Sequence, residues 1–226
     1  MKVEQMLKEG GPVKPYRTYV IGSNLYTYGD GHAHKTTCEI GDIVLSVATL
    51  DHVYLLDKHG MVLCGNVDKD GHVSLDPAER EVFDGPFMSM DAMTSKAYLL
   101  SASGDIYEVA GKRKIRLLHR GGYQKIVCGS KFLVALDANG CASKYGAWFD
   151  GEHVERPTPF HSNVTDVVAG DFHCILLQEN GAAVCYGEKE HLFETVHGVE
   201  KIYVSGKSSL LTGQNFSKYY GGKHGK

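Results

Sequence analysis

Apolar residues along this chain form short runs separated by polar clusters, and one pattern of this kind occurs six times. Each copy has an apolar run, a short polar group that ends in Gly or Asn, and a second run that stops at a glycine. The clearest copy, at residues 172–187, reads FHCILLQENGAAVCYG. Two apolar runs joined by turn residues are typical of a β-hairpin. The predicted hairpins occupy residues 17–29, 52–65, 96–111, 131–146, 172–187 and 207–221.

Glycine or asparagine occupies the corner of every predicted hairpin, and these residue types accept the positive φ of a tight turn most readily. Successive corners are separated by 36, 44, 36, 41 and 34 residues, a period that suits propeller blades. Long stretches with the helical spacing i, i+3, i+4 are absent from the apolar pattern, which disfavours helical repeats. The corners are Asn24, Gly60, Gly104, Gly140, Gly181 and Asn215.

A further apolar run precedes most of the hairpins, and a weaker fourth strand fits the variable stretch after the closing glycine. We therefore predict an all-β chain that forms a single β-propeller domain over residues 1–226. The propeller would have about six short blades, with seven as the alternative, and strands from both termini would close its ring. A sandwich or a barrel is also open, although neither architecture predicts six similar units.

Charge and hydropathy narrow the class of partner. A formal net charge of −3 and a pI near 6.4 provide no field that draws the chain to a phosphate backbone or an anionic membrane. No apolar run approaches the roughly 20 residues of a membrane span, and the first residues lack the apolar core of an export signal. We expect a cytoplasmic protein whose partner is neither a nucleic acid nor a membrane.

The cysteines are dispersed and include no C-x-x-C pair. A free thiol inside an apolar run packs as a small hydrophobic residue. We expect reduced core cysteines, as in a cytosol-like compartment, while their even number keeps a disulfide alternative open. They are Cys38, Cys64, Cys128, Cys141, Cys174 and Cys185.

Residues 169–187, AGDFHCILLQENGAAVCYG, follow the pattern G-x-x-H-x-x-x-L-x-x-x-G and then end in an aromatic residue and glycine. This pattern resembles the regulator of chromosome condensation repeat family. The matching residues are Gly170, His173, Leu177, Gly181, Tyr186 and Gly187.

The chain departs from that family in two ways: the usual Trp before the closing glycine is absent from every copy, and so is the N-x-x-G-Q-L-G stretch. The resemblance implies a propeller, more often of seven blades than of six. It also implies one of the family's roles, which are nucleotide exchange on a small GTPase, light sensing through tryptophan clusters, and enzyme inhibition. Trp148 is the single tryptophan, which disfavours light sensing. What the resemblance leaves is a protein-binding platform.

Motifs typical of catalysis are missing from the sequence. The glycine-containing stretches lack the spacing of a phosphate-binding loop, and no G-x-S-x-G elbow sets a nucleophile on a strained turn. His173 lies on a predicted strand and is more consistent with a buried residue hydrogen-bonded to backbone than with a catalytic base. We predict no enzymatic activity, no cofactor and no small-molecule substrate.

The segment GDGHAHKTTC is the strongest candidate for metal binding. His32 and His34 share one face of an extended chain, and Cys38 follows within reach of the same ion. Because a fourth ligand is missing, we predict no metal site and keep these three residues only as candidates. Asp68 and Asp70 lie in NVDKDGHVSLD, which lacks the closing Glu of a calcium loop, so we expect both carboxylates to face solvent.

Two connecting segments carry residues suited to partner binding. In WFDGEHVERP, the aromatic residues Trp148 and Phe149 stand beside Asp150 and His153, a composition typical of an interface anchor with a polar rim. Trp148 is the preferred hot spot, with a core role as the alternative. The segment GKRKIRLLHR concentrates positive charge and includes Arg113 and Arg116, which would meet an acidic partner surface; a solvated edge that discourages strand addition is the alternative.

These observations favour a non-enzymatic scaffold that presents loops from a rigid propeller to another protein, alone or as a component of a larger assembly. Rigid loops lose little conformational entropy on binding. Two alternatives stay open: an exchange-factor-like regulator of a small GTPase, and a structural component of a viral particle.

Overall fold

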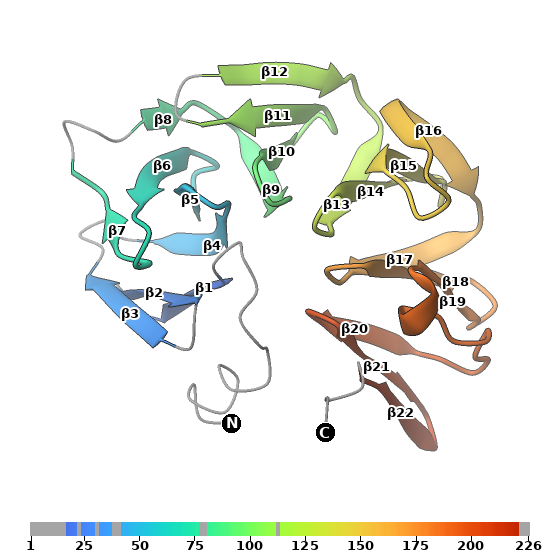
Figure 1. Ribbon diagram of the computed structural model, residues 1–226. Coiled ribbons are helices and arrows are strands. Elements are labelled where there is room, and N and C mark those ends of the chain that lie inside the picture. Colours follow the sequence, from blue (N-terminus) through green and yellow to red (C-terminus); the bar gives the residue numbers. More distant parts are fainter. Residues whose placement is uncertain are drawn as a thin grey trace. The chain divides into compact units, whose positions relative to one another are not determined.

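The computed structural model describes residues 17–21, 24–29, 32–37, 42–76, 81–111 and 114–221. Over these ranges the chain consists of antiparallel strands and one short 3-10 turn, η1 (Lys189–His191) (Figure 1). It divides into two compact units, Met1–Gly121 and Gly122–Lys226. The prediction of an all-β chain is therefore confirmed. Among the described residues no helix is long and apolar enough to cross a membrane.

The first unit contains three antiparallel sheets among its described strands. The first sheet is β1 (Arg17–Ile21), β2 (Asn24–Gly29) and β3 (His32–Thr37). The second is β4 (Ile43–Ala48), β5 (His52–Asp57), β6 (Val62–Val67) and β7 (Val73–Ser74), with β8 (Glu81–Phe83) also paired to β6. The third is β9 (Phe87–Ala92), β10 (Ala97–Ser101), β11 (Ile106–Ala110) and β12 (Lys114–His119).

The second unit likewise contains three antiparallel sheets. One is formed by β13 (Tyr123–Cys128), β14 (Phe132–Asp137), β15 (Ala142–Ala147) and β16 (His153–His161). The next consists of β17 (Val164–Ala169), β18 (His173–Gln178) and β19 (Ala183–Gly187). The last consists of β20 (Lys201–Ser205), β21 (Ser208–Gly213) and β22 (Phe216–Tyr220).

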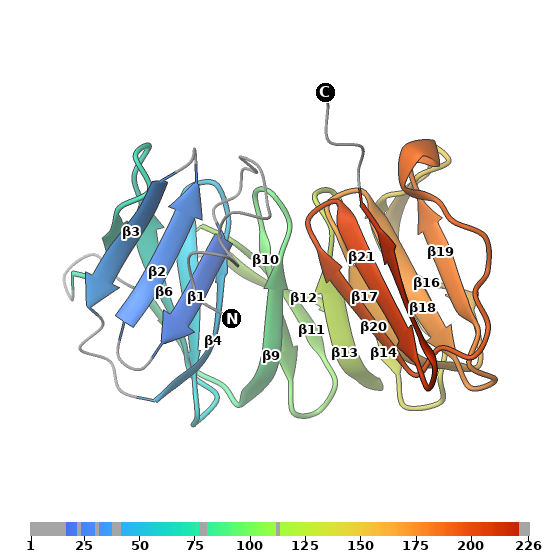
Figure 2. The same cartoon turned by 90° about the horizontal axis from the view of Figure 1, so that it is seen from below.

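Consecutive sheets of each unit pack face to face, and an apolar core fills each contact. In the second unit one core joins Phe132 and Val134 of β14 to Leu176 of β18, and another joins Ile175 of β18 to Leu211 of β21. The middle strands are almost wholly buried because both of their faces are covered, which explains their continuous apolar runs. Figure 1 and Figure 2 both show β17 and β20, the first strands of neighbouring sheets, side by side.

Glycine is required at hairpin corners because the corner touches the backbone of the next sheet. Gly60 has a φ of +84°, and its carbonyl oxygen accepts a 2.9 Å hydrogen bond from the Phe87 amide. A Cβ at Gly60 would lie 2.9 Å from the backbone nitrogen of Phe87. Gly140 has the same role in the second unit: its φ is +75°, and its carbonyl oxygen accepts a 2.9 Å hydrogen bond from the Val164 amide. One residue type thus satisfies both the turn and the sheet contact.

Positive φ was also expected at the two asparagine corners, and this expectation is wrong. Within the described ranges, Asp42 and Asn163 are the non-glycine residues with positive φ. In the last hairpin Gly213 pairs with Phe216, so Gln214 and Asn215 form a two-residue turn that reverses the chain without a left-handed residue.

The segment after the closing glycine of the third hairpin, residues 111–120, is interpreted from the sequence as a basic connecting loop, although a weak fourth strand is also predicted after the closing glycines. Residues 114–119 instead form β12, in which Arg116 pairs with Glu108 of β11. Four of its six residues are exposed, so backbone hydrogen bonding rather than burial of an apolar face holds it in the sheet. The closure of a ring by strands from both termini is not confirmed, since β1 belongs to the first sheet and β22 to the last. Blade number and ring closure stay predictions.

Candidate functional site

Equivalent loops of neighbouring sheets are hydrogen-bonded to one another in the second unit. The Ser130 amide, between β13 and β14, donates to the Asp171 carbonyl oxygen at 2.9 Å. The Asp171 amide, between β17 and β18, donates in turn to the Gly206 carbonyl oxygen at 2.9 Å. A Cβ at Gly129 or at Gly170 would lie within 2.7 Å of the next loop's backbone, so glycine before each of these loops allows the contact.

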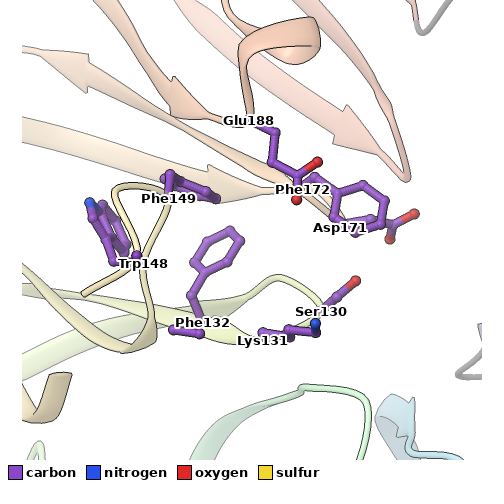
Figure 3. A pocket seen from close by; sticks show the side chains of 10 residues that line it. Ser130, Lys131, Phe132, Trp148, Phe149, Asp171, Phe172 and Glu188 are labelled. Atoms are coloured by element: carbon purple, nitrogen blue, oxygen red, sulfur yellow. The ribbon is translucent and has the colours of Figure 1, made fainter. Parts of the chain in front are cut away.

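A pocket opens beside this pair of loops. Its cavity volume is about 280 Å³, at the lower end of the range for small-molecule sites, and it matches one inserted side chain better than a larger ligand. Three segments line it: the β13–β14 loop, the β15–β16 turn and the β17–β18 loop, with Glu188 after β19 (Figure 3). The lining residues are Ser130, Lys131, Phe132, Ala147, Trp148, Phe149, Gly151, Asp171, Phe172 and Glu188.

Aromatic rings form one wall of the pocket. The ring of Phe132 lies 4.8 Å from that of Phe149 and 5.7 Å from that of Trp148, both in edge-to-face contact. Trp148 continues into the core, where its ring lies 5.0 Å from Phe160. Edge-to-face pairs at these separations fix the rings relative to one another. The wall is therefore rigid before any ligand arrives.

The facing wall is Phe172, which two neighbours hold in place. The His191 ring stacks on Phe172 at 5.8 Å with an interplanar angle of 15°, and the Lys207 ammonium lies 5.2 Å from the centre of the Phe172 ring. His191 also stacks on His173 at 5.6 Å. The ring of Phe172 already accepts a cation, as the negative face of an aromatic ring does.

His173 supports this wall from the interior. Its side chain is 1% exposed, and its Nε2 forms a 2.6 Å hydrogen bond with Ser209 Oγ. Burial lowers the pKa of His173 to about 4, and the neighbouring His191 acts in the same direction. The imidazole is therefore neutral near pH 7. It was expected to be buried and hydrogen-bonded to backbone; the burial is found, but the hydrogen-bonding partner is the Ser209 side chain.

Three charged residues also line the pocket. Asp171 and Glu188 supply two carboxylates, and Lys131 supplies one ammonium group. In the view of Figure 3 the Glu188 carboxylate lies between the rings of Phe149 and Phe172. The arrangement can hold a side chain that combines an apolar or planar body with a positively charged end.

Four residues of the segment WFDGEHVERP were predicted to bind a partner, and two of them, Trp148 and Phe149, line the pocket. Trp148 is buried, 9% exposed; it lines the pocket and also packs in the core, the role weighed as the alternative for it. Phe149 is half-buried and lines the pocket. Asp150 is exposed, and its Oδ1 accepts a 3.0 Å hydrogen bond from the Glu152 amide, which stabilises the turn. His153 is exposed at the start of β16.

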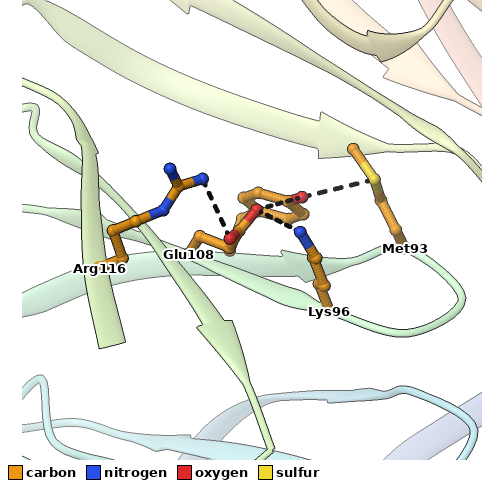
Figure 4. A network of polar contacts seen from close by, with 5 residues as sticks. Met93, Lys96, Glu108 and Arg116 are labelled. Carbon is orange, nitrogen blue, oxygen red and sulfur yellow. Dashed lines mark hydrogen bonds and ion pairs between the residues drawn. The ribbon is translucent and has the colours of Figure 1, made fainter. Parts of the chain in front are cut away.

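The basic segment belongs to the first unit, whereas the pocket belongs to the second. Arg113 lies outside the described residues. Arg116 Nη2 donates to Glu108 Oε1 at 3.1 Å, and Lys96 Nζ donates to Glu108 Oε2 at 3.0 Å (Figure 4). The Arg116 side chain is exposed but already has an acidic partner within the chain. A second acidic group on another protein would have to compete with Glu108.

Of the three metal candidates, only His34 has a side chain that the structure describes. Cys38 lies outside the described residues, and so does the side chain of His32. His34 is half-buried on β3, where its ring lies 4.3 Å from that of His72. His72 belongs to a turn with Asp68 and Asp70, both exposed as expected.

Most of the pocket was missed by reasoning from the sequence, which singled out only Trp148 and Phe149 among its lining residues. Lys131, Asp171, Phe172 and Glu188 were assigned to no site, although a signal for three of them exists. The repeated segments CGSKF and AGDFH place Ser130-Lys131 and Asp171-Phe172 at equivalent positions of successive repeats. Equivalent loops of adjacent propeller blades come together, so aligning the copies indicates that these pairs are neighbours.

Comparisons with known proteins bear on the fold. No protein-family model matches the chain, and a search of the curated proteins finds no match. Solved structures do match. Human WBSCR16 has a TM-score of 0.55 at 15% identity, over 81% of this chain and 55% of that one. The chain thus spans little more than half of that protein's length.

Two further structures cover more of the chain. Prp20p from Saccharomyces cerevisiae, the yeast RCC1, has a TM-score of 0.61 at 12% identity, over 90% of this chain and 71% of that one. The CRINKLY WD40 ectodomain of the Arabidopsis thaliana receptor kinase ACR4 has a TM-score of 0.60 at 16% identity, over 88% and 72%. At these identities the likeness shows fold alone. It supports an RCC1-like β-propeller at the level of structure.

Proposed function

We propose that this chain is a non-enzymatic, protein-binding propeller module, and that the pocket of its second unit receives one side chain from a partner. The observation that carries the proposal is a rigid pocket with aromatic walls and carboxylates among its lining residues. Binding energy at protein interfaces concentrates where one anchor residue fills a preformed pocket. A preformed wall also reduces the entropy lost on association.

The anchor that fits best is a basic side chain, and arginine in particular. Its guanidinium is planar and can stack on Phe149, while its charge faces the carboxylate of Glu188. Lys131 and the Lys207 ammonium over the Phe172 ring oppose this charge pattern, so the choice of arginine rests on its planar guanidinium and on the nearest carboxylate, Glu188, rather than on net charge. An exposed arginine in a loop of the partner could contact the aromatic rings of the pocket and its carboxylate at the same time.

The structural likeness gives general support for a protein partner. The structure of Prp20p is described together with its binding to Gsp1p and histones, and a further structure of it is a complex with Kap60. Those partners belong to that protein. For the present chain they favour the class of partner, another protein, over a small molecule.

Tryptophan fluorescence provides a direct test, because Trp148 is the single tryptophan and lines the pocket. The probe is acetyl-Gly-Arg-Gly-amide, with acetyl-Gly-Glu-Gly-amide as the comparison. We expect the arginine peptide to change the emission of the full chain with a Kd in the low millimolar range, about −4 kcal/mol, as suits a single anchor. Glu188→Gln should weaken this binding at least about threefold.

Capture of the partner from the native source tests whether the pocket also contributes to binding of the whole partner protein. The chain should retain a protein that Glu188→Gln and Phe149→Ala retain less well. The matched controls are Glu179→Gln, an exposed glutamate in the β18–β19 turn, and Tyr203→Ala, an aromatic residue 48% exposed on β20. An interface elsewhere would leave all four variants with the same amount of partner and the emission unchanged by either peptide, and the pocket proposal would then be abandoned.

The predicted alternatives, a regulator of a small GTPase and a structural component of a viral particle, stay predictions. So does the cytoplasmic location.

A further inference from the structure

Three metal-ligating side chains, Asp68, Asp70 and His72, gather in the turn between β6 and β7 of the first unit, and His34 of β3 lies against one of them, His72. The rings of His34 on β3 and His72 in the turn lie 4.3 Å apart in an edge-on arrangement. The ligand atoms of Asp68, Asp70 and His72 all lie within 4.8 Å of one another. A buried hydrogen bond from Thr27 Oγ1 to the Gly71 carbonyl oxygen, 2.6 Å long, ties β2 to the same turn.

The backbone of the turn leaves one oxygen of Asp68 facing the cluster. Asp68 Oδ1 accepts hydrogen bonds from the amides of Asp70 and His72, at 2.8 and 2.9 Å. Asp68 Oδ2 lies 3.2 Å from His72 Nδ1. The first oxygen therefore holds the turn, and the second remains beside an imidazole nitrogen.

Two other hairpins use the same turn without the same side chains. Asp57 Oδ1 accepts from the amides of His59 and Met61, and Asp137 Oδ1 accepts from the amides of Asn139 and Cys141. The turn thus forms with several different residues at its second and fourth positions after the aspartate. The backbone geometry does not explain why Asp70 and His72 occupy them here.

We propose that His34, Asp68, Asp70 and His72 form a binding site for one zinc ion. Two imidazoles with two carboxylates are a donor set that suits zinc, whereas calcium and magnesium prefer oxygen ligands alone. Ligands at the usual zinc distances of about 2.0–2.2 Å in a tetrahedral site lie about 3.3–3.6 Å apart. Asp68 Oδ2 and His72 Nδ1, which are hydrogen-bonded to each other at 3.2 Å, lie close to that spacing and would exchange this bond for the ion.

His34 makes this a site between two sheets rather than a feature of one turn. It comes from the first sheet, while Asp68, Asp70 and His72 follow the third strand of the second sheet. An ion held by both would cross-link the two sheets of the unit. Because the unfolded chain does not hold the four ligands together, zinc would raise the thermal midpoint of the folded protein.

Isothermal titration of the full chain with zinc chloride, after removal of metal with EDTA, tests the site. We expect one zinc ion to bind per chain with a Kd in the micromolar range or tighter, and the thermal midpoint to rise with zinc and fall back with EDTA. His34→Asn and Asp70→Asn should each weaken binding at least about tenfold. Both changes keep a polar side chain at a position that is not fully buried, so the fold should survive.

The matched control is His59→Asn, which removes an exposed histidine from the equivalent turn after β5. It should leave affinity and stoichiometry unchanged. The absence of a saturable zinc heat would overturn the proposal. So would a His34→Asn chain that binds zinc as tightly as the original, because zinc would then be held without the first sheet.

Discussion

The Tyr98 hydroxyl donates a 3.2 Å hydrogen bond to Oε2 of Glu108 inside the first unit. The Glu108 side chain is 9% exposed, and its charge is balanced by Lys96 and Arg116, whose side chains are far more accessible (Figure 4). A buried carboxylate is tolerated when its hydrogen bonds and its counter-charges are both present. The network is thus a buried carboxylate that one hydroxyl and two more exposed cations surround.

This relationship predicts that two variants lose different amounts of free energy of unfolding. Glu108→Gln removes the charge and keeps the shape, and should lower the free energy of unfolding by less than about 1 kcal/mol. The double change Lys96→Met with Arg116→Met leaves the carboxylate buried without these two cations, and should lower it by about 2 kcal/mol, since both cations are partly solvated. Urea unfolding measures both. A glutamine variant less stable than the double variant would contradict the reasoning.

Trp148 should behave as a core residue when it is truncated. Its ring packs against Phe132, Phe149 and Phe160, so Trp148→Ala would leave a large cavity. We expect the free energy of unfolding to fall by about 3–5 kcal/mol, measured by urea denaturation with far-ultraviolet circular dichroism. A loss below about 1 kcal/mol would mean that the ring is not part of the core. Weaker partner binding by Trp148→Ala is therefore informative only if the variant is shown to be folded.

His173 should make stability depend on pH. Its folded pKa is about 4 against an ordinary value of 6.5, so the unfolded chain binds a proton at this site over a range where the folded chain does not. Stability from this group is complete above about pH 6.5 and is lost as the pH falls toward 4, at up to about 1.4 kcal/mol per pH unit. Urea midpoints between about pH 4.5 and 7.5 measure the slope. His173→Gln should flatten it, and an identical slope in that variant would assign the effect to other groups.

Two glycines of the first unit separate backbone strain from steric contact. Gly121 has a φ of +67° with nothing within 4 Å of the position that an added Cβ would take, whereas Gly60 has a φ of +84° and backbone atoms of Phe87 at 2.9 Å. Gly121→Ala should therefore cost about 1–2 kcal/mol, from the left-handed conformation alone. Gly60→Ala should cost about 1–3 kcal/mol more, because the sheet contact must shift. Equal losses of free energy of unfolding in the two variants, measured by urea unfolding, would show that the backbone at the Gly60 corner can shift at little cost.

Much of the local structure follows from the sequence. Strands lie in every predicted hairpin range, and Gly60, Gly104, Gly140 and Gly181 have the positive φ expected of them. Alternation of apolar runs with turn residues is a local property, set by which backbone conformations each residue tolerates and by burial of strands on both faces. The asparagine corners differ from this pattern: Asn24 is a strand residue of β2 paired with Ile21, and Asn215 lies in a two-residue turn without a left-handed residue.

The candidate sites depended on contacts between residues distant in the chain. The sequence singled out Phe149 and His34, but only the packing of one sheet on the next placed Phe149 in the same pocket as Phe172, and His34 beside His72. The tertiary structure also determines that Trp148 is buried and that Arg116 already forms an ion pair with Glu108. Hairpins are specified by neighbouring residues, whereas a site formed by loops of different hairpins exists only after the sheets have packed and paired those loops.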